Sequence, residues 1–66
     1  MNNELVYAEL LILRSTLIKD IKGDVEMLNS GEMSQGDADD LQGLVAANSG
    51  TVLKLSRMIR KEKSND

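Results

Sequence analysis

The chain has 66 residues, 41% hydrophobic and 29% charged, with a formal net charge of −3. This composition is typical of a folded globular chain rather than a disordered one. Cys, His and Pro each number zero, so disulfides and the usual zinc ligands are excluded, and the commonest catalytic base and strongest nucleophile are missing. We therefore expect no enzyme activity, no cofactor and no metal.

A chain this short is marginally stable by core burial alone. A domain near this size buries only about 60% of the surface that its unfolded chain exposes, so small proteins rely on disulfides, metals or oligomerisation. The first two are excluded here, which leaves oligomerisation.

The longest apolar run, Leu10 to Leu13, is far shorter than the ~20 residues of a membrane span. Without a signal-like N-terminus or any cysteine, we expect a cytoplasmic protein that does not enter membranes.

Residues 3–29 are predicted to form the first helix. Apolar side chains recur there at steps of three, four and seven: Val6, Leu10, Leu13, Leu17, Ile21 and Leu28. A neighbouring row contains Tyr7, Leu11, Ile18 and Val25. The start of this helix is apolar around most of its circumference, whereas an ordinary surface helix shows a stripe a little over ~100° wide. The excess predicts that another protein chain covers it.

Residues 30–34 are predicted to form a turn. The triplet Asn-Ser-Gly ending at Gly31 is a helix stop signal, with Gly31 placed for a left-handed cap. Ser34 followed by Asp37 resembles a capping box. A second helix is therefore expected over residues 35–62.

The second helix carries one apolar stripe through a segment of weak helix formers. The stripe contains Ala38, Leu41, Val45, Asn48, Val52, Leu55 and Ile59. Residues 48–51, Asn-Ser-Gly-Thr, favour a kink or a break, but the apolar phase continues across them and no residues are spare for a loop. A continuous helix is the preferred interpretation, and a kinked or split one is the alternative. Residues 63–66 are expected to fray, and the whole chain, 1–66, to form one domain.

Two long helices and a short turn predict an all-α antiparallel hairpin. A lone hairpin leaves one side of both stripes exposed, whereas two hairpins close a four-helix bundle. We therefore expect a homodimer, a dimeric four-helix bundle. Its predicted interface consists of Leu5, Val6, Leu10, Leu13, Leu17, Val52, Leu55 and Ile59.

Two polar features are candidate sites. The first is Asn48 on the apolar stripe. We expect it to pair with Asn48 of a second chain across the bundle axis, which would fix the alignment of the helices. The alternative is a polar pocket between protomers, with Ser49 and Thr51, that holds a small molecule. Near the C-terminus a basic row is a candidate contact for nucleic acid or an acidic partner, although cations also belong in a last helical turn. The row consists of Lys54, Arg57, Arg60 and Lys61.

One resemblance rests on turn and helix motifs over roughly residues 25–61. Leu-Asn-Ser-Gly-Glu-Met-Ser at 28–34, then Asp37-Ala38, Leu41, Ala47 and Val-Leu-Lys-Leu at 52–55, resembles small helical proteins of bacteriophages and prophages. The resemblance implies a compact accessory protein that binds and modulates or inhibits a host protein, or regulates phage genes. In architecture the chain also resembles the acidic hairpin-dimer protein that regulates plasmid copy number by binding RNA loop pairs.

The expected function is therefore contact with a macromolecule. A host protein is the preferred partner. A nucleic-acid-binding regulator using the basic row is the alternative, and a small-molecule-sequestering protein is the second alternative.

Overall fold

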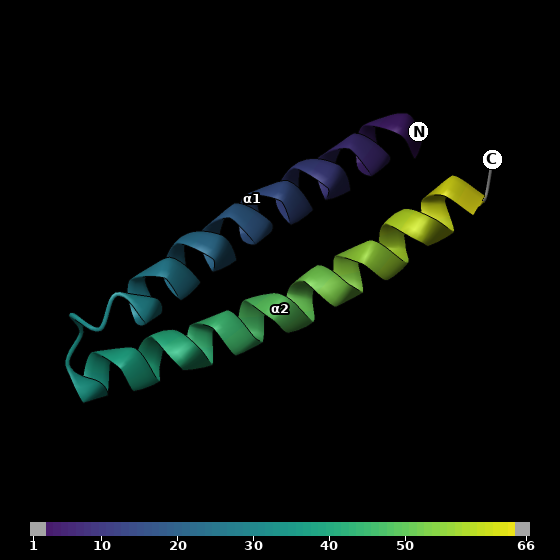
Figure 1. Cartoon of the computed structure of the whole chain (residues 1–66). Helices are drawn as coiled ribbons and strands as arrows, with labels where there is room; N and C mark the ends of the chain where they lie inside the picture. The colour runs from purple at the N-terminus through teal and green to yellow at the C-terminus, as the bar shows by residue number, and fades with distance from the viewer. Residues whose placement is uncertain (1–2, 65–66) are drawn as a thin grey trace.

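Two long helices form an antiparallel hairpin (Figure 1). The computed structural model describes the backbone of residues 3–64 and the side chains of residues 6–64. Helix α1 spans Asn3–Asn29, helix α2 spans Gln35–Ser64, and this part of the chain contains no strand. The start of α1 and the end of α2 lie at the same end of a rod of 48 × 15 × 14 Å. The all-α hairpin is thus confirmed.

Local backbone chemistry fixes the turn. Gly31 has φ of +74°, a conformation that glycine adopts without steric cost and that satisfies carbonyls at a helix end. At the start of α2, the Asp37 N–H donates to Ser34 Oγ at 3.2 Å, which satisfies one of the free N–H groups of the first turn. The left-handed conformation predicted for Gly31 is confirmed, as is the Ser34 acceptor of the predicted capping box.

Helix α2 is continuous through residues 48–51, so the preferred interpretation is confirmed and the alternative, a helix split there, is wrong. The Thr51 hydroxyl donates to the carbonyl of Ala47 at 3.1 Å, a bond that satisfies the hydroxyl without interrupting the helix. Helix α2 also includes Lys63 and Ser64, which the sequence assigned to a frayed tail; the rest of that tail, 65–66, lies outside the described residues.

Each helix turns a row with a seven-residue repeat toward the other helix. In α2 the least exposed positions recur at alternating steps of three and four: Ala38, Leu41, Val45, Asn48, Val52, Leu55, Ile59 and Glu62. This is the predicted stripe with one acidic position added. A strict seven-residue repeat along both helices is typical of two helices packed at a shallow angle.

The inward row of α1 differs from the predicted one. It contains Tyr7, Leu10, Arg14, Leu17, Ile21, Asp24 and Leu28. Arg14 and Asp24 occupy inward positions, which the prediction left out because it considered apolar residues only. Val6 and Leu13 were predicted as part of this row, but they lie beside it and are exposed. Arg14 is accommodated because its Nη1 donates to Ser56 Oγ at 3.1 Å across the hairpin.

The core is small and lies toward the open end of the hairpin. Among the described side chains, Leu10, Leu55 and Ile59 are buried, at 6–8% exposed, and Tyr7, Leu11 and Leu17 pack against them. Between this cluster and the turn, the inward side chains remain partly exposed. One hairpin therefore closes a core over only part of its length.

Candidate interaction surface

One side of the hairpin carries large apolar side chains from both helices. We call this surface the apolar flank; it consists of Val6, Leu13 and Met27 of α1 and Leu44 and Met58 of α2, which are 37–53% exposed. Within each helix these residues lie seven or fourteen positions apart, and since the inward rows repeat every seven residues, they stay on one side. Met27 and Leu44 line the same hollow, which shows that the two rows border the same side.

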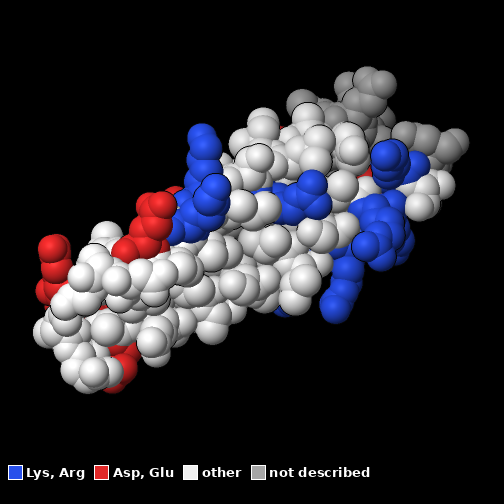
Figure 2. All heavy atoms as spheres, viewed as in Figure 1, with Lys and Arg blue, Asp and Glu red and all other residues white. Residues whose placement is uncertain are grey.

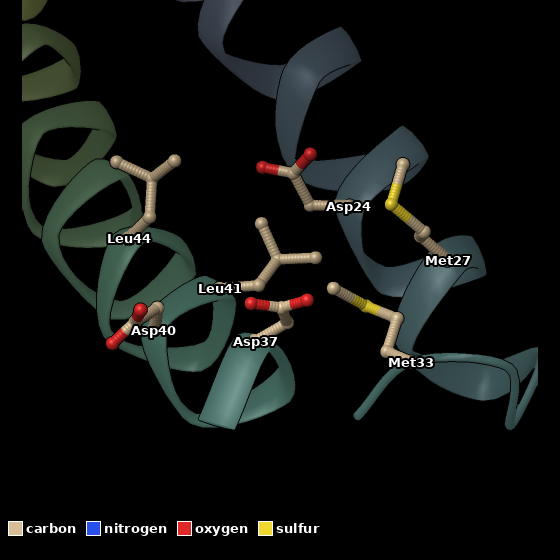
Figure 3. Close-up of a pocket in the computed structure, with 7 residues that line it drawn as sticks. All are labelled: Asp24, Met27, Met33, Asp37, Asp40, Leu41 and Leu44. Carbon is tan, nitrogen blue, oxygen red and sulfur yellow. The ribbon is translucent and has the colours of Figure 1, made fainter. Parts of the chain in front are cut away.

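The hollow lies on this flank at the turn end (Figure 3). Its volume is about 320 Å³, and its lining combines apolar side chains with three carboxylates. These residues are Asp24, Met27, Met33, Asp37, Asp40, Leu41 and Leu44. Side chains from α1, α2 and the turn point toward one another across it. The hollow is therefore a shallow apolar depression with acidic groups around it.

A second hollow, of about 450 Å³, lies against Glu9, Ile12 and Leu13 on α1. Leu13 also belongs to the apolar flank, so this hollow borders that surface. Ile12 lies two residues after the buried Leu10, which on a helix turns it about 200° away from the inward row. It is the most exposed large apolar side chain described, at 65%.

The opposite side of the hairpin is more polar. Leu11, Ile18 and Val25 recur there every seven residues along α1. The facing row of α2 is polar and consists of Gln42, Ser49 and Ser56, the last of which accepts the Arg14 hydrogen bond. Ile18 and Val25 are 42% and 38% exposed. Only α1 therefore contributes large apolar side chains to this side.

Charge is separated along the rod (Figure 2). From Lys19 to Asp40, around the turn, the sequence holds seven acidic and two basic residues; from Lys54 to Lys63, near the open end, it holds five basic residues and one acidic. In space, acidic groups gather toward the turn and basic groups toward the open end. The hairpin is consequently a rod with one negative and one positive end.

The predicted basic row is accessible along the last third of α2. All four of its residues, Lys54, Arg57, Arg60 and Lys61, are exposed. Lys54 and Lys61 continue, at steps of seven, the line of Asp40 and Ala47. They therefore border the apolar flank, while Arg57 and Arg60 face outward.

The residues predicted for the interface between chains fall into three groups. Leu10, Leu55 and Ile59 are buried within one hairpin and have little surface left for a second chain. Leu17 and Val52 are half-buried on the inward rows, and only Val6 and Leu13 lie exposed on the apolar flank. The side chain of Leu5 lies outside the described residues. The predicted interface did not include Met27, Leu44 and Met58. Met27 lies fourteen residues after Leu13, and Leu44 and Met58 lie fourteen residues apart; this spacing of two seven-residue repeats is the signal that finds them.

Asn48 is half-buried on the inward row of α2, as expected from its place in the stripe. The two hollows described above are lined by other residues. Its pairing with a second Asn48, or its part in a pocket between protomers, requires a second chain and stays a prediction.

Comparison with protein-family models, curated proteins and solved structures gives no match. The resemblance to small phage proteins accordingly stays a prediction. Within residues 3–64, neither helix combines the length and apolarity of a membrane span. Among the same residues, no three acidic, His or Cys side chains are grouped so that they hold a metal ion.

Proposed function

We propose that this protein is non-catalytic and works by contact, as a self-associating helical hairpin that binds and modulates another protein. The observation that supports this is the imbalance between covered and uncovered apolar side chains. Three are buried, while nine large ones among the described residues are 37–65% exposed. Soluble monomers rarely leave large contiguous apolar surface uncovered, and such surface marks contact sites.

The exposed apolar side chains lie on more than one side. Five form the apolar flank, Ile18 and Val25 lie on the opposite side, and Ile12 and Leu53 face outward, each two residues from a buried position. A second copy seated on the apolar flank leaves the opposite side uncovered. We therefore assign the opposite side to a different protein. Modulation of a host protein by a phage-type accessory protein remains the specific form of this role that the sequence resemblance implies.

Affinity capture tests the binding role. The tagged chain is incubated with lysate of its source cells, with and without nuclease. We expect a protein that is retained after nuclease treatment and lost from the Ile18→Ser/Val25→Ser variant. The matched control is Ile12→Ser, which removes a more exposed apolar side chain from a different face. Equal capture by both variants would contradict the assignment of the opposite side, and no specific capture by the wild type would contradict the binding role.

Nucleic-acid binding is a second candidate, favoured by the exposed basic row. Each phosphate neutralised by Lys or Arg adds about one to the slope of log affinity against log salt. If this candidate is right, capture depends on nucleic acid, and Arg57→Ala/Arg60→Ala lowers the slope for duplex DNA or structured RNA by about two. Lys19→Ala/Lys22→Ala, which removes two charges from α1, is the control. An unchanged slope in the arginine variant excludes the candidate.

A further inference from the structure

We infer that the apolar flank is covered by a second copy of this chain, turned so that the acidic turn of each hairpin lies over the basic open end of the other. The inference rests on the proposed function, whose self-association it makes specific.

The exposed area supports an occupant of this size. The hairpin exposes 5134 Å², whereas a compact monomer of 7.3 kDa is expected to expose about 4,200 Å². The excess of roughly 900 Å² is close to the ~800 Å² that each partner contributes to a standard protein interface. A second hairpin of equal length, laid along the rod, covers such an area.

Two symmetric arrangements place one apolar flank against another. With the two-fold axis along the rod, turn lies on turn, and the segments from Lys19 to Asp40 of the two copies, each with seven acidic and two basic residues, lie over each other. With the axis across the rod, the acidic turn meets the basic open end. Like charges brought together are unfavourable and opposite charges fix orientation, so the charge separation selects the second arrangement.

In α2, the two residues of the apolar flank and one pair of opposite charges beside it lie symmetrically about such an axis. Leu44 and Met58 lie seven residues on either side of Thr51, and Asp40 and Lys61 lie eleven and ten residues on either side of it. An axis near Thr51 therefore places Leu44 against Met58 of the other copy and Asp40 near its Lys61. Within α2, the two apolar residues of the flank therefore meet, and Asp40 lies near a residue of opposite charge.

Helix α1 gives the same axis independently. The midpoint between Val6 and Met27 falls at residues 16 and 17. Leu10 of α1 belongs to the same buried cluster as Leu55 and Ile59 of α2, so in antiparallel helices residues 16 and 17 lie level with the segment around Thr51. One axis across the rod therefore pairs Leu44 with Met58 in α2 and Val6 with Met27 in α1, while Leu13 lies opposite Asp20, the charged residue of the same row of α1.

Introduced cysteines test the surface and the orientation, since the natural chain has none. Each single-cysteine variant is treated with a short bismaleimide cross-linker after its helix content is checked by circular dichroism. Thr51→Cys, on the axis, is expected to give a covalent dimer. Ser49→Cys, two residues away on the opposite side, is the control and is expected to stay uncross-linked.

A mixture of two variants tests the pairing separately. In the inferred arrangement, Leu44 lies about 21 Å from its own copy, at ~1.5 Å per residue over fourteen residues, but next to Met58 of the other chain. Leu44→Cys and Met58→Cys are each expected to stay uncross-linked alone and to give a heterodimer when mixed.

The outcomes separate the inference from the function on which it rests. A dimer by sedimentation in which Leu44→Cys cross-links to itself overturns the orientation, because that result belongs to turn-on-turn packing. A dimer in which Ser49→Cys cross-links and Thr51→Cys does not overturns the choice of surface. In both cases self-association stands. A monomer by sedimentation without cross-links overturns self-association itself.

Discussion

At the turn, backbone conformation and capping hydrogen bonds hold the chain, whereas at the open end three packed side chains do. Gly31 and Ser34 act within a few residues of sequence, but Leu10 is buried only because residues 45 and 49 positions later fold back onto it. The two ends therefore depend differently on the rest of the molecule. Local changes should affect the turn, and only changes in packing should affect the open end.

The largest effect is expected at the open end. Leu55→Ala should destabilise the fold by about 2–3 kcal/mol, the lower part of the range for buried leucines, because the site lies in a small core. Leu53→Ala, two residues away and 60% exposed, should change stability by less than about 0.5 kcal/mol. Urea unfolding followed by circular dichroism measures both. Equal losses would mean that the packing at Leu55 is not what holds this end.

A smaller effect is expected at Gly31. Alanine there should cost about 1 kcal/mol, because an L-residue is strained at φ of +74°. Gly43→Ala is the matched control. An added Cβ meets nothing within 4 Å at Gly43, so alanine in this helical position should stabilise by about 0.5–1 kcal/mol. The same sign for both changes in thermal unfolding would show that the left-handed turn is absent in solution.

The smallest effect is expected at the cap of α2. Ser34→Ala should cost roughly 0.5 kcal/mol, the low end of the range for a lost cap, because the acceptor for the Asp37 N–H is lost at an exposed position. Ser34→Asp keeps an acceptor and should stay near wild type. Hydrogen exchange of the first turn of α2 locates the effect; a uniform increase along both helices in the alanine variant would be inconsistent with a local cap.

The sequence predicted the elements well because their signals are local. Both caps and the α2 stripe follow from residue types within one or two turns. The inward face of α1 was harder to predict, since apolar residues surround most of that helix and several faces fit the period. Arg14 lies inward on the seven-residue repeat, where Ser56, 42 positions away, accepts its hydrogen bond, a partner that apolar periodicity does not reveal. Of the apolar flank, only Val6 and Leu13 were predicted as interface residues, because the flank can be identified as a surface only once the inward faces of both helices are known.

The central claim is that a single hairpin leaves too much apolar surface uncovered to be the complete folded unit. Sedimentation together with thermal unfolding over a hundredfold range of protein concentration tests it most directly. We expect a dimer mass at the high end and a Tm that falls on dilution, because folding and association are linked. A monomer mass throughout, with an unchanged Tm, would contradict the claim.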